Sequence, residues 1–243
     1  MNNNNFIAGA GYLMDGFQLI FKPGLKRFVI IPLLINIIIF TGLFLLSRHF
    51  FGEFNHWFEN FLPNWLKWLG TILWLLFFIG FVLFFMFFFV TIANIVAAPF
   101  NSFLSEKVEV YLTGKTANQL TLFETIKDVP RIMGRQIAIL GYYLPRAVLL
   151  LILFFVPIIQ VAAALLWFLF NAWFMTLQYT DYPTDNHRIA FSEVRVKLGQ
   201  MRWLSLGFGM SVLVLTMIPV LNFLIIPAAV AGATKMWVEA EVT

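Results

Sequence analysis

Residues 28–47 read FVIIPLLINIIIFTGLFLLS, a run of 20 residues without a charged side chain. About 20 apolar residues suffice to cross the hydrocarbon core of a bilayer as a helix. Three longer segments are also free of Asp, Glu, Lys and Arg: residues 68–105, 147–180 and 203–234. Together the four runs indicate an all-α integral membrane protein.

The composition agrees with this class. Hydrophobic residues make up 61% of the 243-residue chain and charged residues 12%, whereas a globular domain has about 25% charged residues. No Ser/Pro-rich linker divides the chain, so we expect a single integral membrane domain over residues 1–243. The first apolar run is too long for a signal peptide and lacks a cleavage pattern, and we expect it to remain in the mature protein.

The lengths of the runs predict two kinds of membrane element. The first two runs predict long transmembrane helices at about 28–47 and 69–97. The last two contain 34 and 32 residues, which is more than one span but less than the roughly 40 residues that two spans need. They are interrupted by Pro157, Pro219 and Pro227. We therefore expect two proline-broken, half-inserted (re-entrant) helical hairpins at about 147–180 and 203–234, shielded by protein or a water-filled cavity.

The basic residues distinguish hairpins from single crossings. If both hairpins return to the side they came from, 14 of the 16 Lys and Arg residues lie on one side, and only Arg48 and Lys67 lie on the other. If each run crossed once, the division would be 10 against 6. Because cytoplasmic loops are enriched in Lys and Arg, the hairpins are favoured, with both termini in the cytoplasm.

Two segments predict amphipathic helices on the membrane surface. Residues 6–21 are apolar apart from Asp15, their glycines permit close packing, and Pro23-Gly24 ends them. A polar insert over residues 106–146 carries six Lys or Arg residues, which predicts a cytoplasmic position. Within this insert, apolar residues between Leu122 and Val129 have helical spacing.

Motifs for catalysis are missing from the sequence. Cysteine does not occur, which excludes disulfides, thiolate metal sites and cysteine nucleophiles. The three histidines are too far apart to predict a metal site, and no nucleotide-binding glycine loop or hydrolase motif occurs. Nucleic-acid binding would need a basic face with interleaved aromatic residues on a soluble domain. We therefore expect no enzyme, no cofactor and no nucleic-acid partner.

The strongest candidate site is PGLKRF, residues 23–28. A helix that begins near Gly24 exposes backbone N–H groups and the positive end of its dipole, and glycine lets an oxyanion approach the backbone. Lys26 adds a mobile charge, and Arg27 adds a planar set of donors. The plainer interpretation is that Pro-Gly ends one helix and the two cations only follow the orientation rule.

Polar residues within the apolar runs form a second candidate group. Asn94, Asn101 and Glu106 lie near the inner end of the second run, where they could line a vestibule. The alternative is that residues 99–102 are a helix stop and restart. Asn36 needs a partner inside a bilayer, and a contact between helices is favoured over a role in the pore.

A third group is YTDYPTDNHR, residues 179–188, between the predicted hairpins. Its two carboxylates, His187 and Arg188 could bind protons or act as a gate. The favoured interpretation is a hydrogen-bonded connector in which Asp185 caps the next helix.

Five stretches of the chain resemble the CysZ sulfate permease family: GYLMDGFQLIFKPGLKRFVIIPLLIN, NIVAAPFNSFLSEKVE, YYLPRAVLLL, QYTDYPTDNHR and NFLIIPAAVAGATKMWVE. They keep their order over nearly the whole chain, which makes the match specific. The resemblance implies a multi-pass protein of the bacterial inner membrane that admits sulfate for cysteine biosynthesis. It also implies two transmembrane helices with two half-inserted hairpins, assembled as a homo-oligomer among membrane lipids.

The resemblance also implies a sulfate site. The family's Gly-Leu-Arg segment corresponds here to Gly24, Leu25 and Lys26, with Arg27 beside them. Lys26 stands where the family commonly has arginine, so Arg27 is expected to supply the paired hydrogen bonds. Passive, channel-like conduction is favoured over a carrier, because no inverted repeat is evident. The alternative function is a non-transporting structural or regulatory membrane subunit whose Pro-Gly-Leu-Lys-Arg segment binds anionic lipid.

Overall fold

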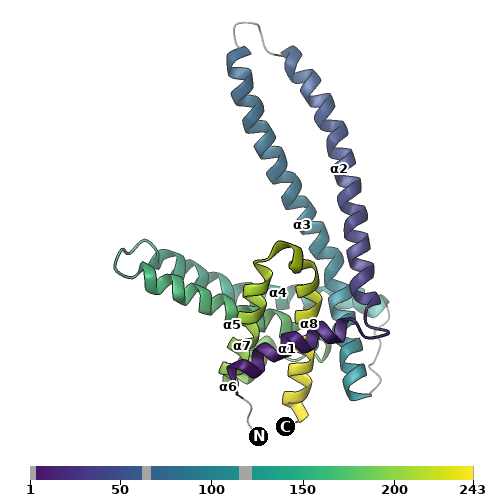
Figure 1. The fold of residues 1–243 in the computed structure, drawn as a ribbon, viewed down its shortest axis with the longest axis vertical. Helices are drawn as coiled ribbons and strands as arrows, with labels where there is room; N and C mark the ends of the chain where they lie inside the picture. Colours follow the sequence, from purple (N-terminus) through teal and green to yellow (C-terminus); the bar gives the residue numbers. More distant parts are fainter. Residues whose placement is uncertain (1–3, 62–66, 115–121, 243) are drawn as a thin grey trace. The chain divides into compact units, whose positions relative to one another are not determined.

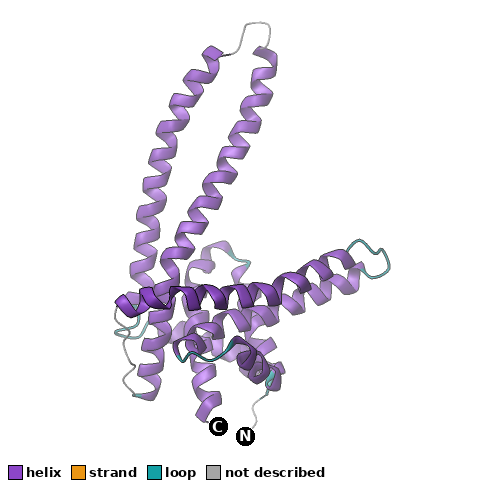
Figure 2. Ribbon diagram, turned by 180° about the vertical axis from the view of Figure 1, so that it is seen from behind, coloured by secondary structure: helices purple, strands orange, loops and turns teal. Residues whose placement is uncertain are grey.

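A computed structural model describes residues 4–61, 67–114 and 122–242. Over these residues the chain forms α-helices and no strand (Figure 2). The helices, labelled in Figure 1, are α1 (Phe6–Ile20), α2 (Arg27–Phe61), α3 (Lys67–Thr113), α4 (Leu122–Leu153), α5 (Gln160–Asn186), α6 (Phe191–Gln200), α7 (Arg202–Thr216) and α8 (Pro219–Val242). The predicted all-α class is confirmed.

The chain folds as two compact units. The first unit contains Met1–Val29 and Asn101–Thr243, and the second contains Ile30–Phe100. The second unit consists of most of α2 and the first part of α3, which contact each other through phenylalanine rings. The ring centroids of Phe40 and Phe89 are 5.1 Å apart, and those of Phe54 and Phe77 are 3.7 Å apart.

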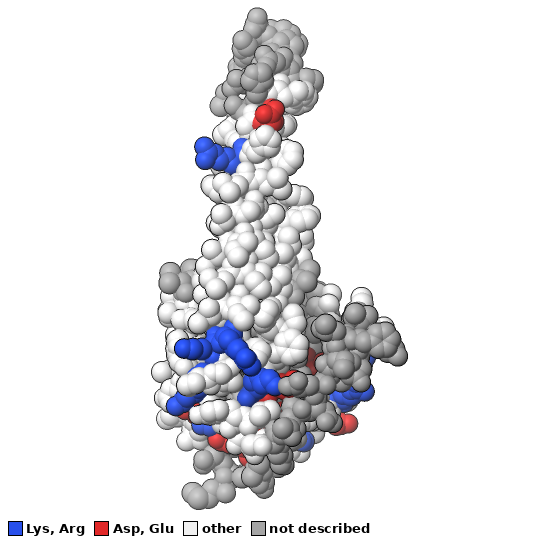
Figure 3. Space-filling view, turned by 90° about the vertical axis from the view of Figure 1, so that its right-hand side faces the viewer, with Lys and Arg blue, Asp and Glu red and all other residues white. Residues whose placement is uncertain are grey.

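The surface of the second unit is apolar. The most hydrophobic windows of α2 and α3 are 6% and 0% buried within the protein, and Figure 3 shows a long stretch of these helices without charged side chains. Such a surface is stable in contact with lipid, where both helices satisfy their own backbone hydrogen bonds. Among the described residues, five segments are long and apolar enough to cross a membrane: Arg27–Phe54, Ile72–Thr113, Pro130–Leu153, Gln160–Asn186 and Leu221–Ala240.

Both long helices continue beyond the apolar runs that predicted them. α2 extends past residue 47 to Phe61, and α3 extends past residue 97 to Thr113. The proposed helix stop at residues 99–102 is wrong, because Pro99 lies inside α3. A proline removes one hydrogen bond from a helix, and the remaining bonds of this 47-residue helix maintain it.

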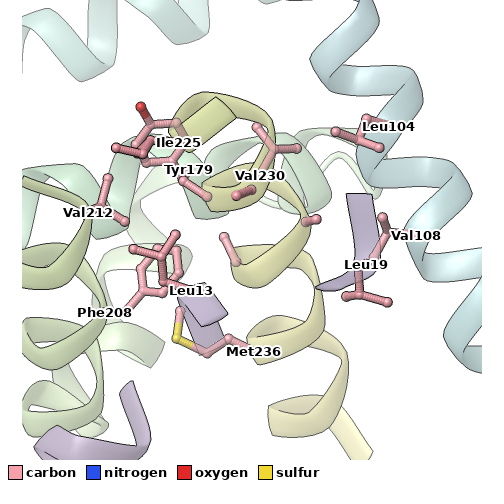
Figure 4. Packing of buried hydrophobic residues seen from close by; sticks show 14 of the residues in the cluster. Leu13, Leu19, Leu104, Val108, Tyr179, Phe208, Val212, Ile225, Val230 and Met236 are labelled. Atoms are coloured by element: carbon pink, nitrogen blue, oxygen red, sulfur yellow. The ribbon is translucent and has the colours of Figure 1, made fainter. Parts of the chain in front are cut away.

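In the first unit, α1 packs against α7 and α8 (Figure 1). Its glycines allow the helix backbones to touch: a Cβ atom added to Gly9 would lie 2.0 Å from the Leu204 carbonyl oxygen. The predicted helix and its close glycine packing are confirmed. Beside this contact lies the hydrophobic core, whose buried side chains include Leu13, Phe208, Val212, Ile225, Val230 and Met236 (Figure 4).

Two helical hairpins complete the first unit. α4 and α5 are joined by residues 154–159, which include Pro157, and α7 and α8 are joined by residues 217–218. The chain breaks at Pro157 and just before Pro219, as expected, but Pro227 lies inside α8 without interrupting it. The first hairpin is longer than residues 147–180, because α4 begins at Leu122 within the polar insert. The half-inserted depth of both hairpins stays a prediction.

Candidate functional site

Residues 21–26 form a turn that connects α1 to α2, and the candidate residues Gly24–Arg27 lie at its end. Gly24 has a φ of +88°, a backbone conformation that side chains other than glycine rarely adopt. Leu25 is only 3% exposed and anchors the turn in the hydrophobic core, whereas Gly24, Lys26 and Arg27 are exposed. The turn therefore presents a glycine backbone and two cations to its surroundings from a fixed position.

Hydrogen bonds within the turn determine which amides can contact an anion. The Lys22 carbonyl oxygen accepts from the N–H groups of Leu25 at 3.1 Å and Lys26 at 3.3 Å. As a result the helix does not begin near Gly24, as the sequence suggested, but at Arg27. Over the described part of the chain, the amides of Gly24 and Arg27 have no backbone acceptor. These two N–H groups and the two exposed cations are the kinds of donor that bind an oxyanion in proteins.

The Arg27 side chain is positioned by its neighbour. Its Cζ atom lies 4.9 Å from the ring centroid of Phe28, and Phe28 packs partly against the core. A guanidinium group stacked on a ring keeps the N–H donors at its edge available. Arg27 can therefore offer paired hydrogen bonds to an oxyanion at the turn.

The predicted vestibule residues are divided between the two units. Asn36 on α2 and Asn94 on α3 belong to the second unit, and the side chain of Asn94 lies outside the described residues. The Oδ1 atom of Asn36 is shielded from solvent, and no described residue donates a hydrogen bond to it. Asn101 and Glu106 belong to the first unit, together with the turn.

In the first unit, polar residues of α3 contact α5 and α8. Asn101 is 8% exposed, and its Nδ2 donates to the Tyr182 hydroxyl at 3.3 Å. The carboxylate of Glu106 lies 3.4 Å from Lys107 Nζ. Three further pairs join the helices: Ser102 with Asn186 at 2.8 Å, Ser105 with Thr234 at 2.9 Å, and Glu109 with His187 at 2.8 Å. The end of α3 is therefore held by a row of polar contacts.

The sequence did not predict a charged cluster between α4 and the end of α5. The Arg135 side chain is 8% exposed, and its guanidinium lies 2.7 Å from Asp181 Oδ1 and donates to Thr184 Oγ1 at 3.0 Å. Arg131 donates to both carboxylate oxygens of Asp185. Each pair of like charges is four residues apart, so it lies on one face of its helix. This repeated spacing is the signal that could have revealed the cluster.

The expectation that Asp185 caps the next helix is wrong. α5 continues through Asp185 to Asn186, so most of the predicted connector is the last part of a helix. The N-cap residue of α6 is Ala190, which has no side-chain oxygen to accept a hydrogen bond. Asp185 instead forms an ion pair with Arg131, and a charged partner makes the stronger hydrogen bond.

Polar contacts also join α1 to α8 near the C-terminus. The Tyr12 hydroxyl donates to Glu239 Oε2 at 2.7 Å. Burial raises the pKa of the Tyr12 hydroxyl above its ordinary value, and the hydrogen bond to Glu239 raises it further. Asp15, the one charged residue of α1, lies 2.8 Å from Lys235 Nζ. α1 is therefore held by ion pairing as well as by its glycine contacts.

Known proteins resemble this chain over most of its length. The family described as sulfate transporter CysZ/etoposide-induced protein 2.4 matches residues 12–227, a range that includes the turn and the four residues predicted to line a vestibule. The sulfate transporter CysZ of Pectobacterium atrosepticum is 44% identical over 236 residues, which cover 96% of this chain and 85% of the relative. The sulfate transporter CysZ of Pseudomonas fluorescens is 45% identical over 239 residues, which cover 96% of this chain and 94% of the relative.

Proposed function

The chain belongs to the sulfate transporter CysZ/etoposide-induced protein 2.4 family, and from this premise we propose that it transports sulfate across a membrane. The observation that carries the proposal is its identity of 44% and 45% to two sulfate transporters over 96% of its length. Its long apolar helices make it a multi-pass membrane protein. A transporter of this family is not an enzyme.

The membrane is the bacterial inner membrane, where imported sulfate supplies cysteine biosynthesis. Both termini lie in the cytoplasm, because 14 of the 16 Lys and Arg residues then share that side if both hairpins are half-inserted. The turns at residues 154–159 and 217–218 support this arrangement, because each joins two helices that contact each other, so both ends of a hairpin can lie on the same side.

The Gly24–Arg27 turn is the sulfate site. Sulfate is a dianion, and the turn combines exposed cations at Lys26 and Arg27 with two amides that have no backbone acceptor in the described part of the chain. Backbone N–H groups bind an oxyanion without providing a full counter-charge. Leu25 fixes the turn through the core, so the site is formed before the anion arrives.

In the second unit, Asn36 lines the path that sulfate follows. The Oδ1 atom of Asn36 supports this role, because a shielded amide in a lipid-exposed helix needs a partner. Water in the path or a second copy of the chain would supply that partner. We also propose that the chain forms a homo-oligomer, because a second copy could supply the hydrogen-bond partner of Asn36 Oδ1.

Uptake of labelled sulfate by sealed liposomes tests the function. Vesicles with the purified chain should accumulate sulfate above empty vesicles, and Arg27→Ala should lower the rate at low sulfate concentration. Arg48→Ala is the matched control, because Arg48 is one of the two basic residues expected on the opposite side. If the wild-type vesicles admit no more sulfate than empty vesicles, the chain is a structural or regulatory subunit.

A further inference from the structure

Two hollows between α4, α5 and α6 share Arg146. One has a volume of about 490 Å³ and is lined by Arg146, Arg195 and Ser192 together with Tyr142. The other has a volume of about 370 Å³ and, apart from Arg146, is lined by apolar residues such as Leu149, Leu169 and Trp173. A polar hollow and an apolar hollow therefore meet at one arginine.

The polar hollow carries two positive charges on one ring. The Cζ atoms of Arg146 and Arg195 lie 4.0 Å and 4.9 Å from the ring centroid of Tyr142. Within the described chain, no carboxylate forms an ion pair with either arginine, and Arg195 Nε is shielded without a hydrogen-bond partner. Two positive charges at one ring, without a carboxylate partner, attract an anion.

Neighbouring groups complete an anion site. Trp173 Nε1 donates to the Tyr142 hydroxyl at 3.0 Å, which fixes the ring that both guanidinium groups contact. α6 begins beside the hollow at Phe191, and its N-cap Ala190 leaves the first amides of the helix without a side-chain acceptor. These amides, the Ser192 hydroxyl and the two arginines are donors that suit a phosphate group.

The apolar hollow identifies the kind of phosphate. Arg146 is the last charged residue before the charge-free run at residues 147–180, so it lies where headgroups meet hydrocarbon. Past Arg146 the exposed residues of α4 are apolar; Leu149, for example, is 59% exposed. A free oxyanion would leave the apolar hollow unused, whereas an acyl chain would fill it.

We propose that this Arg146–Arg195 site binds an anionic glycerophospholipid. The phosphate lies between Arg146 and Arg195, and one acyl chain lies against Leu149, Leu169 and Trp173. The site uses α4, α5 and α6, not the turn at Gly24, so the inference does not depend on sulfate transport.

Native mass spectrometry of the full chain in neutral detergent tests this proposal. Phosphatidylglycerol and phosphatidylcholine with identical acyl chains are added, and the retained lipid is counted. Wild-type protein should prefer phosphatidylglycerol. Arg146→Gln and Arg195→Gln should each weaken its binding about fivefold, and the double variant about thirtyfold, which corresponds to about 1 kcal/mol for each basic residue at an anionic membrane. Arg202→Gln, at an exposed arginine outside both hollows, should have no effect.

A second pair of measurements separates lipid from free phosphate. Leu169→Trp fills the apolar hollow without changing charge and should weaken phosphatidylglycerol binding, while inorganic phosphate should not displace the lipid. Circular dichroism melting of each variant checks that it is folded; Arg146 is exposed, so its variant is the safest. Wild-type affinity in the folded Arg146→Gln variant would overturn the proposal. The proposal would also be overturned if inorganic phosphate displaced the lipid and the Leu169→Trp variant bound phosphatidylglycerol as tightly as the wild type.

Discussion

Gly16 of α1 touches the backbone of α8 at Ala228: a Cβ atom added to Gly16 would lie 2.0 Å from the Ala228 carbonyl oxygen. The contact is reciprocal, because a Cβ atom on Gly232 would lie 2.3 Å from the Tyr12 carbonyl oxygen. Real Cβ atoms do not approach backbone this closely, so the two helices pack only because both residues are glycine. The turn at Gly24 follows α1 directly and is therefore positioned by this contact.

Replacing Gly16 should loosen α1. Gly16→Ala forces the helices apart, and we expect it to lower the stability by about 1–3 kcal/mol, the usual cost of overpacking. Gly11→Ala is the matched control, since nothing lies within 4 Å of a Cβ atom added there; it should raise the stability by up to about 1 kcal/mol. Thermal unfolding in detergent measures the stability of both variants. Equal melting temperatures for the two would contradict the close contact between Gly16 and α8.

The Arg135–Asp181 pair should be essential for stability. Asp181→Ala leaves the guanidinium of Arg135 buried without its main partner, and we expect a loss of about 3–5 kcal/mol. The double variant Arg135→Met with Asp181→Leu should recover much of this loss, because neither charge then remains buried. Chemical unfolding monitored by circular dichroism gives the values. If the double variant is less stable than Asp181→Ala, the unpaired charge of Arg135 is not the cause of the stability lost in Asp181→Ala.

Gly24 should matter for sulfate binding as well as for backbone conformation. Gly24 and Gly114 both have positive φ angles, +88° and +68°, and neither has an atom within 4 Å of an added Cβ. Alanine at either position should therefore cost about 1 kcal/mol of backbone strain. Only Gly24→Ala should weaken sulfate binding in an equilibrium titration. Equal affinities for the two variants would move the sulfate site away from the turn.

Asn36 offers a test of the sulfate path. If Oδ1 faces water in the path, Asn36→Leu should lower sulfate uptake and leave the melting temperature unchanged or higher. If the amide instead joins helices, the same change should lower the melting temperature, because the remaining partner is left unpaired. Uptake and thermal unfolding of one preparation distinguish the two roles.

Local patterns in the sequence predicted most of the helices. Long runs without charge gave the membrane class, and Pro157 marked a real break because the chain reverses there. Pro99 and Pro227 were expected to end or interrupt helices and do not. One proline removes one hydrogen bond, and whether the helix then ends depends on packing that the sequence does not reveal.

Long-range pairs were harder to predict. Arg135 and Asp181 are 46 residues apart. Asp185 was predicted to cap a helix, but it forms an ion pair with Arg131 of a distant helix. The turn at Gly24 was predicted because its residues are adjacent in the sequence. Its free amides were not predicted correctly, because the Lys22 carbonyl oxygen occupies two of them.

The most direct test of the account is anomalous diffraction from crystals soaked with selenate, the selenium analogue of sulfate. We predict a selenium peak within hydrogen-bonding distance of the Gly24 and Arg27 amides, which is lost in Arg27→Ala crystals. A peak elsewhere in the protein, with none at the turn, would contradict the central claim that these residues bind the transported anion.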